Sequence, residues 1–399
     1  MGSSLDTVYA EWDRLSTVRV HTPGIEVWAG TLDYETNLFE QMIPPERARA
    51  EHEKIISCLK DTCVEVHQLA DDLETAGVLD DLIRESISEI DANSSADVEI
   101  IIETFNSREK LHLALAQVSM RQPKEEISST SLTIDQPLSN MYFQRDTTIL
   151  GDKGPILCNM FEPVRQREVP IVRDAWEGIG ADIIYEMDMH VEGGEFLPAG
   201  EFALLGVSAN LDGKEHVIRT SYAAGQELMD SGAIEYDEFV LVRAPLQADR
   251  EFRKEHDTGS RIMHLLGWVN IVAEDLIVLD ADLARAANVD VYERHGDEYA
   301  KEHSSNLYDY LAEEKGFEIV DVSWSERWPT NFLTIESETI LPLYEPDANG
   351  EYRSENNPTI EKLKELGVEI LPDGAGIPRD ALTNGGGGIH CMTTPLSRE

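Results

Sequence analysis

The chain has 399 residues, enough for one large domain or two to three domains of average size. Its 77 acidic residues outnumber 33 basic residues and give a formal net charge of -44. This balance argues against nucleic acid and anionic membranes as partners, because both require cationic surfaces. No apolar run approaches the ~18 residues of a membrane span, and no signal segment opens the chain, so we expect a cytoplasmic location.

The acidic residues are dispersed along the chain and are not gathered in a tail. Such a composition is typical of proteins that work in molar salt, where a Debye length of ~3 Å at 1 M screens the self-repulsion. The sequence therefore predicts a halophilic host.

The four cysteines are too few and too scattered for a disulfide scaffold. Cys58, Cys63 and His67 would offer three zinc ligands, but packed thiols are the simpler interpretation. We therefore assign no metal ligand from the sequence.

Helices that end at a small residue and lead into a strand recur along the chain. The strand-like segment TVRVHTP comes first, and a helix that opens at Pro44 and Pro45 follows it. The same helix-to-strand pattern then occurs four more times, and the spacing predicts a pseudo-repeat with an insertion in the first long gap. The turn residues of the five copies are Cys63, Gly180, Gly232, Gly316 and Gly367.

The insertion, residues 72–129, has helical spacing in LDDLIRESISEI, VEIIIETF and REKLHLALAQVSM. We expect an inserted helical subdomain there, with residues 1–71 and 130–399 forming an α/β catalytic domain. A doubly wound sheet would also alternate helix and strand. No glycine-rich phosphate loop follows TVRVHTP, which argues against a dinucleotide-binding fold.

Two segments in the middle of the chain place carboxylates beside turns. NMYFQRD carries Asn140 and Asp146 around an aromatic stretch that we expect to be a strand, with Arg145 on its opposite face. HVEGGEFLPAG carries Glu192 before two glycines, which allow close backbone approach. The alternative without a catalytic role is a strand end for the first segment and a plain hairpin turn for the second.

Two later segments offer a histidine and a cysteine. RIMHLLGWVNIV is an expected apolar strand interrupted by His264, which is an ordinary core residue unless a partner lies near it. GGGGIHCMTTPLSRE carries Cys391 beside glycines that supply flexibility and free N–H groups. A cysteine with a distant histidine and carboxylates is a pattern of covalent hydrolases. A disordered tail would not return to the strand-like CMTTPL.

Together these segments resemble the guanidino-group-modifying (pentein) superfamily and, within it, the arginine deiminases. VRVHTPGIEV, ERARAEHEKI, PLSNMYFQRD, HVEGGEFLP, IMHLL and GGGGIHCMTTPLSRE follow the order of that family over nearly the whole chain. The resemblance implies a five-bladed pseudo-symmetric α/β propeller with an inserted helical subdomain. It also implies hydrolysis of L-arginine, a small-molecule substrate, to L-citrulline and ammonia without metal or organic cofactor.

The resemblance also implies roles for four residues. Cys391 would attack the guanidinium carbon and form a covalent thiouronium intermediate. His264 would protonate the departing ammonia and then activate water. Asp146 and Glu192 would hold the guanidinium, which agrees with the need to fix a cationic group within reach of the sulfur.

Four further positions concern substrate recognition, and two of them depart from the pattern of the family. Asn140 and Arg165 match positions that bind the substrate α-carboxylate in arginine deiminases. Leu266 stands where a second aspartate is usual, and a leucine there would leave room for a substituted guanidinium nitrogen. Asn210 falls where a further carboxylate-binding arginine is expected, unless an insertion lets Arg219 take its place.

These departures leave alternatives open. A methylated-arginine hydrolase, an amidinotransferase and a catalytically silent arginine-binding relative all share the resemblance. A homo-oligomer is also left open.

Overall fold

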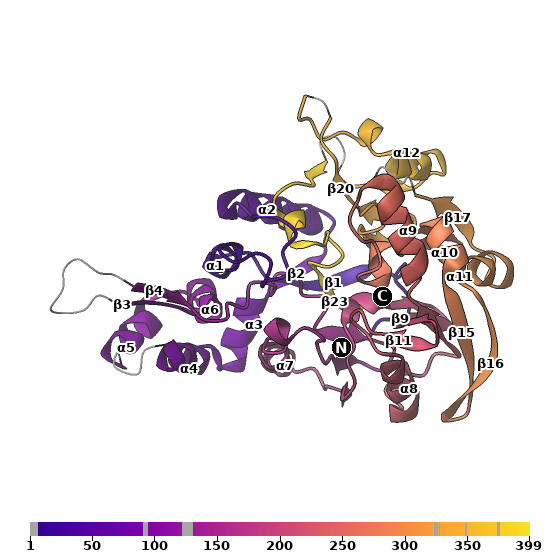
Figure 1. Ribbon diagram of the computed structural model, residues 1–399. Helices are drawn as coiled ribbons and strands as arrows, with labels where there is room; N and C mark the ends of the chain where they lie inside the picture. The colour runs from indigo at the N-terminus through magenta and orange to yellow at the C-terminus, as the bar shows by residue number, and fades with distance from the viewer. Residues whose placement is uncertain are drawn as a thin grey trace.

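The computed structural model describes residues 7–90, 95–121, 131–322, 326, 328–347, 349–372 and 376–399. Within these ranges the protein is a mixed α/β structure, as predicted, and its strands form several small sheets with no closed sheet among them (Figure 1). No helix in these ranges combines the length and the apolar character needed to cross a bilayer.

Five of the sheets share one topology. In each, two antiparallel strands are followed by a helix and by a third strand that pairs parallel to the second. We call these sheets units 1 to 5. The strands of the units are, in order: β23 (Thr394–Arg398), β1 (Leu15–Val20) and β2 (Glu65–Gln68); β5 (Thr148–Leu150), β6 (Pro155–Leu157) and β7 (Tyr185–Glu186); β8 (Phe196–Ala199), β9 (Phe202–Val207) and β12 (Glu238–Arg243); β13 (Val269–Ala273), β14 (Leu276–Leu279) and β17 (Glu318–Asp321); β18 (Leu333–Glu336), β19 (Thr339–Leu341) and β21 (Glu369–Ile370).

Each unit turns from helix to third strand through a left-handed residue. The five turn residues expected from the sequence have φ angles of +64° at Cys63, +80° at Gly180, +68° at Gly232, +77° at Gly316 and +94° at Gly367. Glycine adopts this conformation without steric cost, which is why it ends four of the five helical segments. The helices of the units are α2 (Pro45–Asp61), α7 (Glu168–Gly178), α8 (Tyr222–Ser231), the pair α10 (Ala281–Ala286) and α11 (Leu307–Asp309), and α12 (Pro358–Glu365).

A hairpin inserted in unit 4 extends the sheet of unit 3. The hairpin of β15 (Asn288–His295) and β16 (Glu298–Asn306) leaves the chain between α10 and α11 and extends the sheet of unit 3 by antiparallel pairing with β12. The remaining elements are α1 (Ile25–Thr31), α9 (Leu246–His256) and the strand pairs β10 (Ala209–Leu211) with β11 (Lys214–His216) and β20 (Leu343–Tyr344) with β22 (Ile377–Pro378).

Four helices and a hairpin follow β2. Figure 1 shows α4, α5 and the hairpin on one side of the molecule, and Leu73, Leu111 and Trp176 share one apolar cluster, so α3 and α6 pack against α7 of the body. The subdomain at residues 72–129 stays a prediction, and its residues 91–94 and 122–129 lie outside the described part. These elements are α3 (Leu69–Ala76), α4 (Leu79–Ile90), α5 (Ser95–Thr104), α6 (Ser107–Ala116), β3 (Val118–Arg121) and β4 (Ser131–Ile134).

The end of the chain is anchored in the body. Pro395 of β23 pairs with Val18 of β1, and the backbone of Arg14 and Glu399 exchanges two hydrogen bonds of 3.1 and 2.8 Å. The segment with Cys391 therefore leads directly into an anchored strand, and the alternative of a disordered glycine tail is wrong.

Candidate active site

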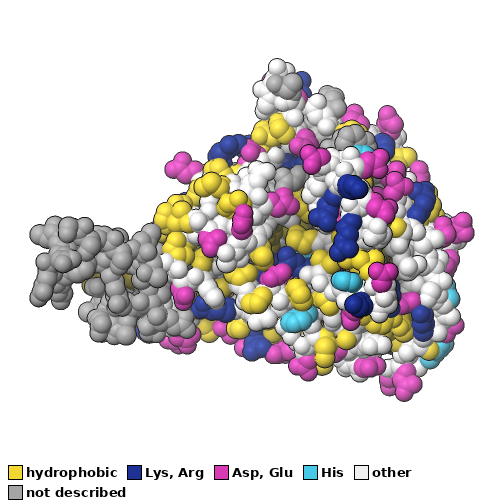
Figure 2. All heavy atoms as spheres, in the orientation of Figure 1, with side chains coloured by type: hydrophobic (Ala, Val, Ile, Leu, Met, Phe, Trp, Pro, Cys, Tyr) yellow, Lys and Arg dark blue, Asp and Glu magenta, His cyan; other side chains and the backbone are white. Residues whose placement is uncertain are grey.

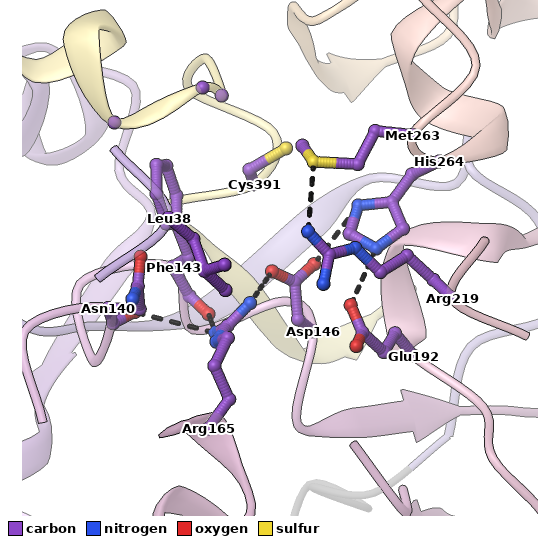
Figure 3. A pocket seen from close by; sticks show the side chains of 13 residues that line it. Leu38, Asn140, Phe143, Asp146, Arg165, Glu192, Arg219, Met263, His264 and Cys391 are labelled. Carbon is purple, nitrogen blue, oxygen red and sulfur yellow. Dashed lines mark hydrogen bonds and ion pairs between the residues drawn. The ribbon is translucent and has the colours of Figure 1, made fainter. Parts of the chain in front are cut away.

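A small cavity gathers all seven residues that the sequence singled out for catalysis and substrate binding (Figure 3). Its volume is about 20 Å³, close to the space of a single water. An amino acid the size of arginine therefore enters only after lining residues move. The lining consists of Asn140, Asp146, Arg165, Glu192, Arg219, His264 and Cys391, together with Leu38, Phe143, Met263 and Gly385 to Gly387.

The site is built from equivalent loops of the five units. Each unit contributes one residue from the segment just before its first strand. The five residues are Cys391 before β23, Asp146 before β5, Glu192 before β8, His264 before β13 and Asn331 before β18. The repeat therefore explains how residues far apart in the chain meet at one place.

Two strands that the sequence predicted around the active site are not formed, so these two predictions are wrong. The segment from Asn140 to Asp146 forms turns, and its strand begins only at Thr148; His264 precedes a short 3-10 helix, and its strand begins at Val269. These loops bond to one another and not to sheet neighbours, as in the 2.8 Å hydrogen bond from the N–H of Gly193 to the carbonyl of Asp146. The bend still sends Asp146 into the cavity.

His264 lies between two carboxylates. Its Nε2 is 2.8 Å from Oε2 of Glu192, and its Nδ1 is 3.7 Å from Oδ1 of Asp146. Burial alone would lower the pKa of His264, but the charge of Asp146, then the Cys391 sulfur and Glu192, raise it well above its ordinary value. Burial opposes ionisation of Glu192 as well, yet its hydrogen bond to His264 lowers its pKa. The geometry therefore favours an imidazolium at neutral pH.

Asp146 already holds a guanidinium group, that of Arg165. Nη1 of Arg165 is 2.5 Å from Oδ2 of Asp146, and its Nη2 is 2.8 Å from Oε2 of Glu168. Figure 3 shows Arg165 and His264 on opposite sides of the Asp146 carboxylate. Arg165 thus occupies Oδ2 of this carboxylate, whereas Oδ1 has no hydrogen-bond partner among the described residues. Glu168 lies three residues after Arg165 in the chain, but the sequence did not single it out.

Cys391 is held by Asn331, which the sequence did not identify. Nδ2 of Asn331 donates to the Cys391 sulfur at 3.0 Å, and the backbone N–H of Cys391 donates to Oδ1 of Asn331 at 3.3 Å. The signal that could have found Asn331 is its place before the first strand of the fifth unit.

The glycines before Cys391 are needed because other groups approach them closely. A Cβ atom at Gly387 would lie 3.2 Å from the Cys391 sulfur and 2.7 Å from the Phe143 ring, and one at Gly388 would lie 2.8 Å from Oδ1 of Asn331. A Cβ at Gly194 would lie 2.7 Å from Nδ1 of His264. Glycine thus allows the loops to converge around the reacting groups.

Replacing Asn331 with alanine is expected to lower kcat by about 10- to 100-fold. A hydrogen bond to a charged acceptor is worth about 1.5 to 3 kcal/mol, and the variant removes the donor to the sulfur. The check is the steady-state rate together with the rate at which iodoacetamide alkylates Cys391 at fixed pH, which should fall in parallel. An unchanged alkylation rate in a folded variant would show that Asn331 only supports the loop.

Of the two candidates for the further carboxylate-binding position, the structure places Arg219 at the cavity. Its Nη2 is 3.6 Å from the Met263 sulfur and its Nη1 is 3.1 Å from Oε1 of Glu162. Asn210 is exposed on β10 and does not line the cavity. The location of the two residues therefore favours Arg219 over Asn210 for this role.

Leu266 does not line the cavity either. Its side chain is fully buried in an apolar cluster that includes Val269 and Leu279. The idea that Leu266 makes room for a substituted guanidinium is therefore not supported.

A buried ionic network lies behind the Cys391 loop. Glu11 pairs with Arg145 at 3.3 Å, with Arg398 at 3.0 Å and with His390 at 3.4 Å. Burial opposes ionisation of Glu11, but the two guanidinium groups hold its pKa well below the usual range. Nε of Arg145 also donates to the carbonyl of Thr393 at 3.1 Å, so the network ties this loop to the start of the chain.

Comparison with solved structures defines the class of fold. The N-terminal domain of ArgZ, described as an arginine dihydrolase of cyanobacteria, superposes with a TM-score of 0.55 at 13% identity over 96% of this chain and 98% of its own. A DDAH from Pseudomonas aeruginosa complexed with citrulline superposes with a TM-score of 0.52 at 12% identity over 95% and 98%. Both are pentein-fold proteins, and this likeness places the chain in the same fold class.

Sequence comparison then defines the family. The arginine deiminase family model matches residues 36–398. An arginine deiminase from Halobacterium salinarum is 34% identical over 98% of this chain and 96% of its own length, and one from Streptococcus agalactiae is 24% identical over 98% of both. The chain belongs to the arginine deiminase family.

Proposed function

We propose that this protein hydrolyses L-arginine to L-citrulline and ammonia. The observation that carries the proposal is the meeting of Cys391, His264, Asp146 and Glu192 in one buried cavity of an arginine deiminase family member. The Cys391 thiolate attacks the guanidinium carbon, and the C–N bond to a terminal nitrogen breaks. That nitrogen leaves as ammonia with a proton from His264, and a thiouronium remains on the sulfur.

The second half of the reaction releases the product. His264, now neutral, takes a proton from a water molecule that attacks the same carbon. The C–S bond breaks, the proton left on the oxygen passes to solvent and is taken up by ammonia, citrulline leaves and the thiolate returns. Glu192, at 2.8 Å from Nε2, stabilises the imidazolium at both stages.

Arginine binding is proposed to exchange ion pairs. The substrate guanidinium replaces that of Arg165 at Asp146, and the freed Arg165 meets the substrate α-carboxylate. Arg219 and Asn140, which line the same cavity, complete that subsite. The exchange keeps each charged group paired, which limits the desolvation cost of binding.

The deciding experiment incubates the purified protein with L-arginine in molar KCl and follows citrulline and ammonia. Equal amounts of the two products, absent from a Cys391→Ser variant, support the proposal. If the folded protein makes no citrulline, methylated arginines and amidino acceptors are tested next as substrates of the alternative hydrolase and amidinotransferase. If the protein binds arginine but converts none of these substrates, it is a catalytically silent relative.

Replacing Arg219 with glutamine is expected to raise KM for arginine by about 10- to 100-fold, with a smaller effect on kcat. The variant loses a charged hydrogen bond to the α-carboxylate, worth about 1.5 to 3 kcal/mol, that is present before and during the reaction. Asn210→Ala is the control and should leave both constants unchanged. A raised KM in Asn210→Ala, with an unchanged KM in Arg219→Gln, would assign the carboxylate-binding role to Asn210.

A halophilic setting is proposed from the charge. Asp and Glu side chains are spread around the face shown in Figure 2, and one similar arginine deiminase comes from Halobacterium salinarum. High salt screens the repulsion among these charges, so the free energy of unfolding should rise with KCl concentration.

The five-bladed propeller arrangement of the units, the cytoplasmic location and a homo-oligomeric state stay predictions.

A further inference from the structure

A second group of titratable side chains lies outside the active-site cavity. His21 follows β1, Glu26 belongs to α1 and His112 belongs to α6, and their ligand atoms lie within 4.8 Å of one another. All three are buried, and none lines the cavity of Cys391. The proposed reaction uses none of them.

The carboxylate of Glu26 is only partly satisfied. Its Oε1 accepts a 2.7 Å hydrogen bond from the N–H of Gly24 and lies 3.3 Å from Nε2 of His21. Its Oε2 is buried and has no hydrogen-bond partner among the described residues. A buried carboxylate oxygen without a donor is costly, and a bound cation would satisfy it.

One ring nitrogen of His112 has a lone pair that a metal could use. Its Nε2 is 2.8 Å from the carbonyl of Thr22, and since a carbonyl can only accept, Nε2 carries the proton. The lone pair available to a metal is therefore on Nδ1. Histidine ligands commonly fix their tautomer by such a bond to a backbone carbonyl. Gly24 permits the arrangement, because a Cβ there would lie 2.4 Å from Nδ1.

His52 of α2 is a fourth donor beside the group. Its side chain is fully buried, and neither ring nitrogen has a hydrogen-bond partner among the described residues. It is close enough to His21 for the two rings to interact electrostatically. An imidazole with both nitrogens buried and unpaired is rare in folded proteins, and a bound metal would satisfy one of the two.

We propose that His21, Glu26, His52 and His112 bind one divalent transition-metal ion of the zinc type. Three imidazoles and one carboxylate suit zinc in ligand chemistry and in number. Bonds of about 2.1 Å in a tetrahedron place ligand atoms about 3.4 Å apart. The ligand atoms of His21, Glu26 and His112 lie within 4.8 Å of one another and therefore close by at most about 1.4 Å, whereas His52 lies outside this group and has to move further. The ion ties α2 and α6 to the segment after β1 and takes no part in the guanidinium reaction.

The test uses the Cys391→Ser/His264→Gln double variant, because Asp146, Glu192 and His264 also form a three-ligand group. Zinc content is measured by plasma mass spectrometry after dialysis, and affinity by competition with a chromophoric chelator. One equivalent of zinc per chain is expected. Adding His112→Gln should weaken binding by at least about 100-fold, since even loss of a group that orients a ligand costs 10- to 100-fold. His303→Gln, an exposed histidine outside every three-ligand group of the described residues, is the matched control and should change nothing.

Two results would overturn the proposal. One is the absence of stoichiometric zinc in the folded double variant. The other is equal zinc affinity with and without His112→Gln. If the His112 variant does not fold, cobalt substitution of the double variant decides: tetrahedral absorption from nitrogen and oxygen ligands is expected, and its absence rejects the site. Neither outcome depends on citrulline formation, so failure here leaves the proposed function standing.

Discussion

Citrulline formation from L-arginine should fall by at least about 10⁴-fold when Cys391 is replaced with serine. The thiolate is the attacking group, and a serine hydroxyl at this place has no comparably activated form, so the covalent step is lost. Arginine binding should remain, because Asp146, Glu192 and Arg219 are untouched. Rates are measured by citrulline release, and binding by isothermal titration calorimetry.

A matched control comes from the same residue type. Cys63 is exposed and distant from the cavity lining, so Cys63→Ser should keep its activity. Acid quenching of the wild-type reaction should leave a mass adduct on the peptide that contains Cys391. Full activity of the Cys391→Ser protein, or an adduct on another cysteine, would refute the nucleophile.

Loss of His264 is expected to cost about 10²- to 10⁴-fold in kcat, the usual contribution of a general acid–base. The dependence of the wild-type kcat on pH should also reflect the protonation of His264. Asp146, Cys391 and Glu192 raise the pKa of His264 despite its burial. The proton that ammonia needs is therefore present through neutral pH and is lost as the pH rises through the raised pKa, so kcat should decline only on that alkaline side.

Neutralising one of the surrounding carboxylates tests this assignment. In Glu192→Gln the hydrogen bond that helps to raise the pKa of His264 is weakened, so the alkaline decline should move to lower pH whatever the absolute rate. His295→Gln, exposed and far from the lining, is expected to leave the profile unchanged. An alkaline midpoint that does not move in Glu192→Gln would mean that another group supplies the proton.

The sequence was a good guide wherever a property depends on neighbouring residues. Left-handed turn residues can be recognised because only glycine accepts them readily, and the structure confirms that conformation at Gly180, Gly232, Gly316 and Gly367. Family resemblance, carried by short motifs, led to Cys391 and the other cavity residues. The strand expected around Asp146 was wrong because contacts with other loops, and not local preference, shape that segment.

Contacts between distant segments required the tertiary structure. Asn331 holds the Cys391 sulfur, Arg165 occupies the Asp146 carboxylate, and Arg219 instead of Asn210 reaches the cavity. None of these follows from spacing along the chain, because each depends on how the loops of different units pack against one another. Local pattern thus determined the repeating units and the candidate groups, and the convergence of five loops on one cavity decided which groups meet.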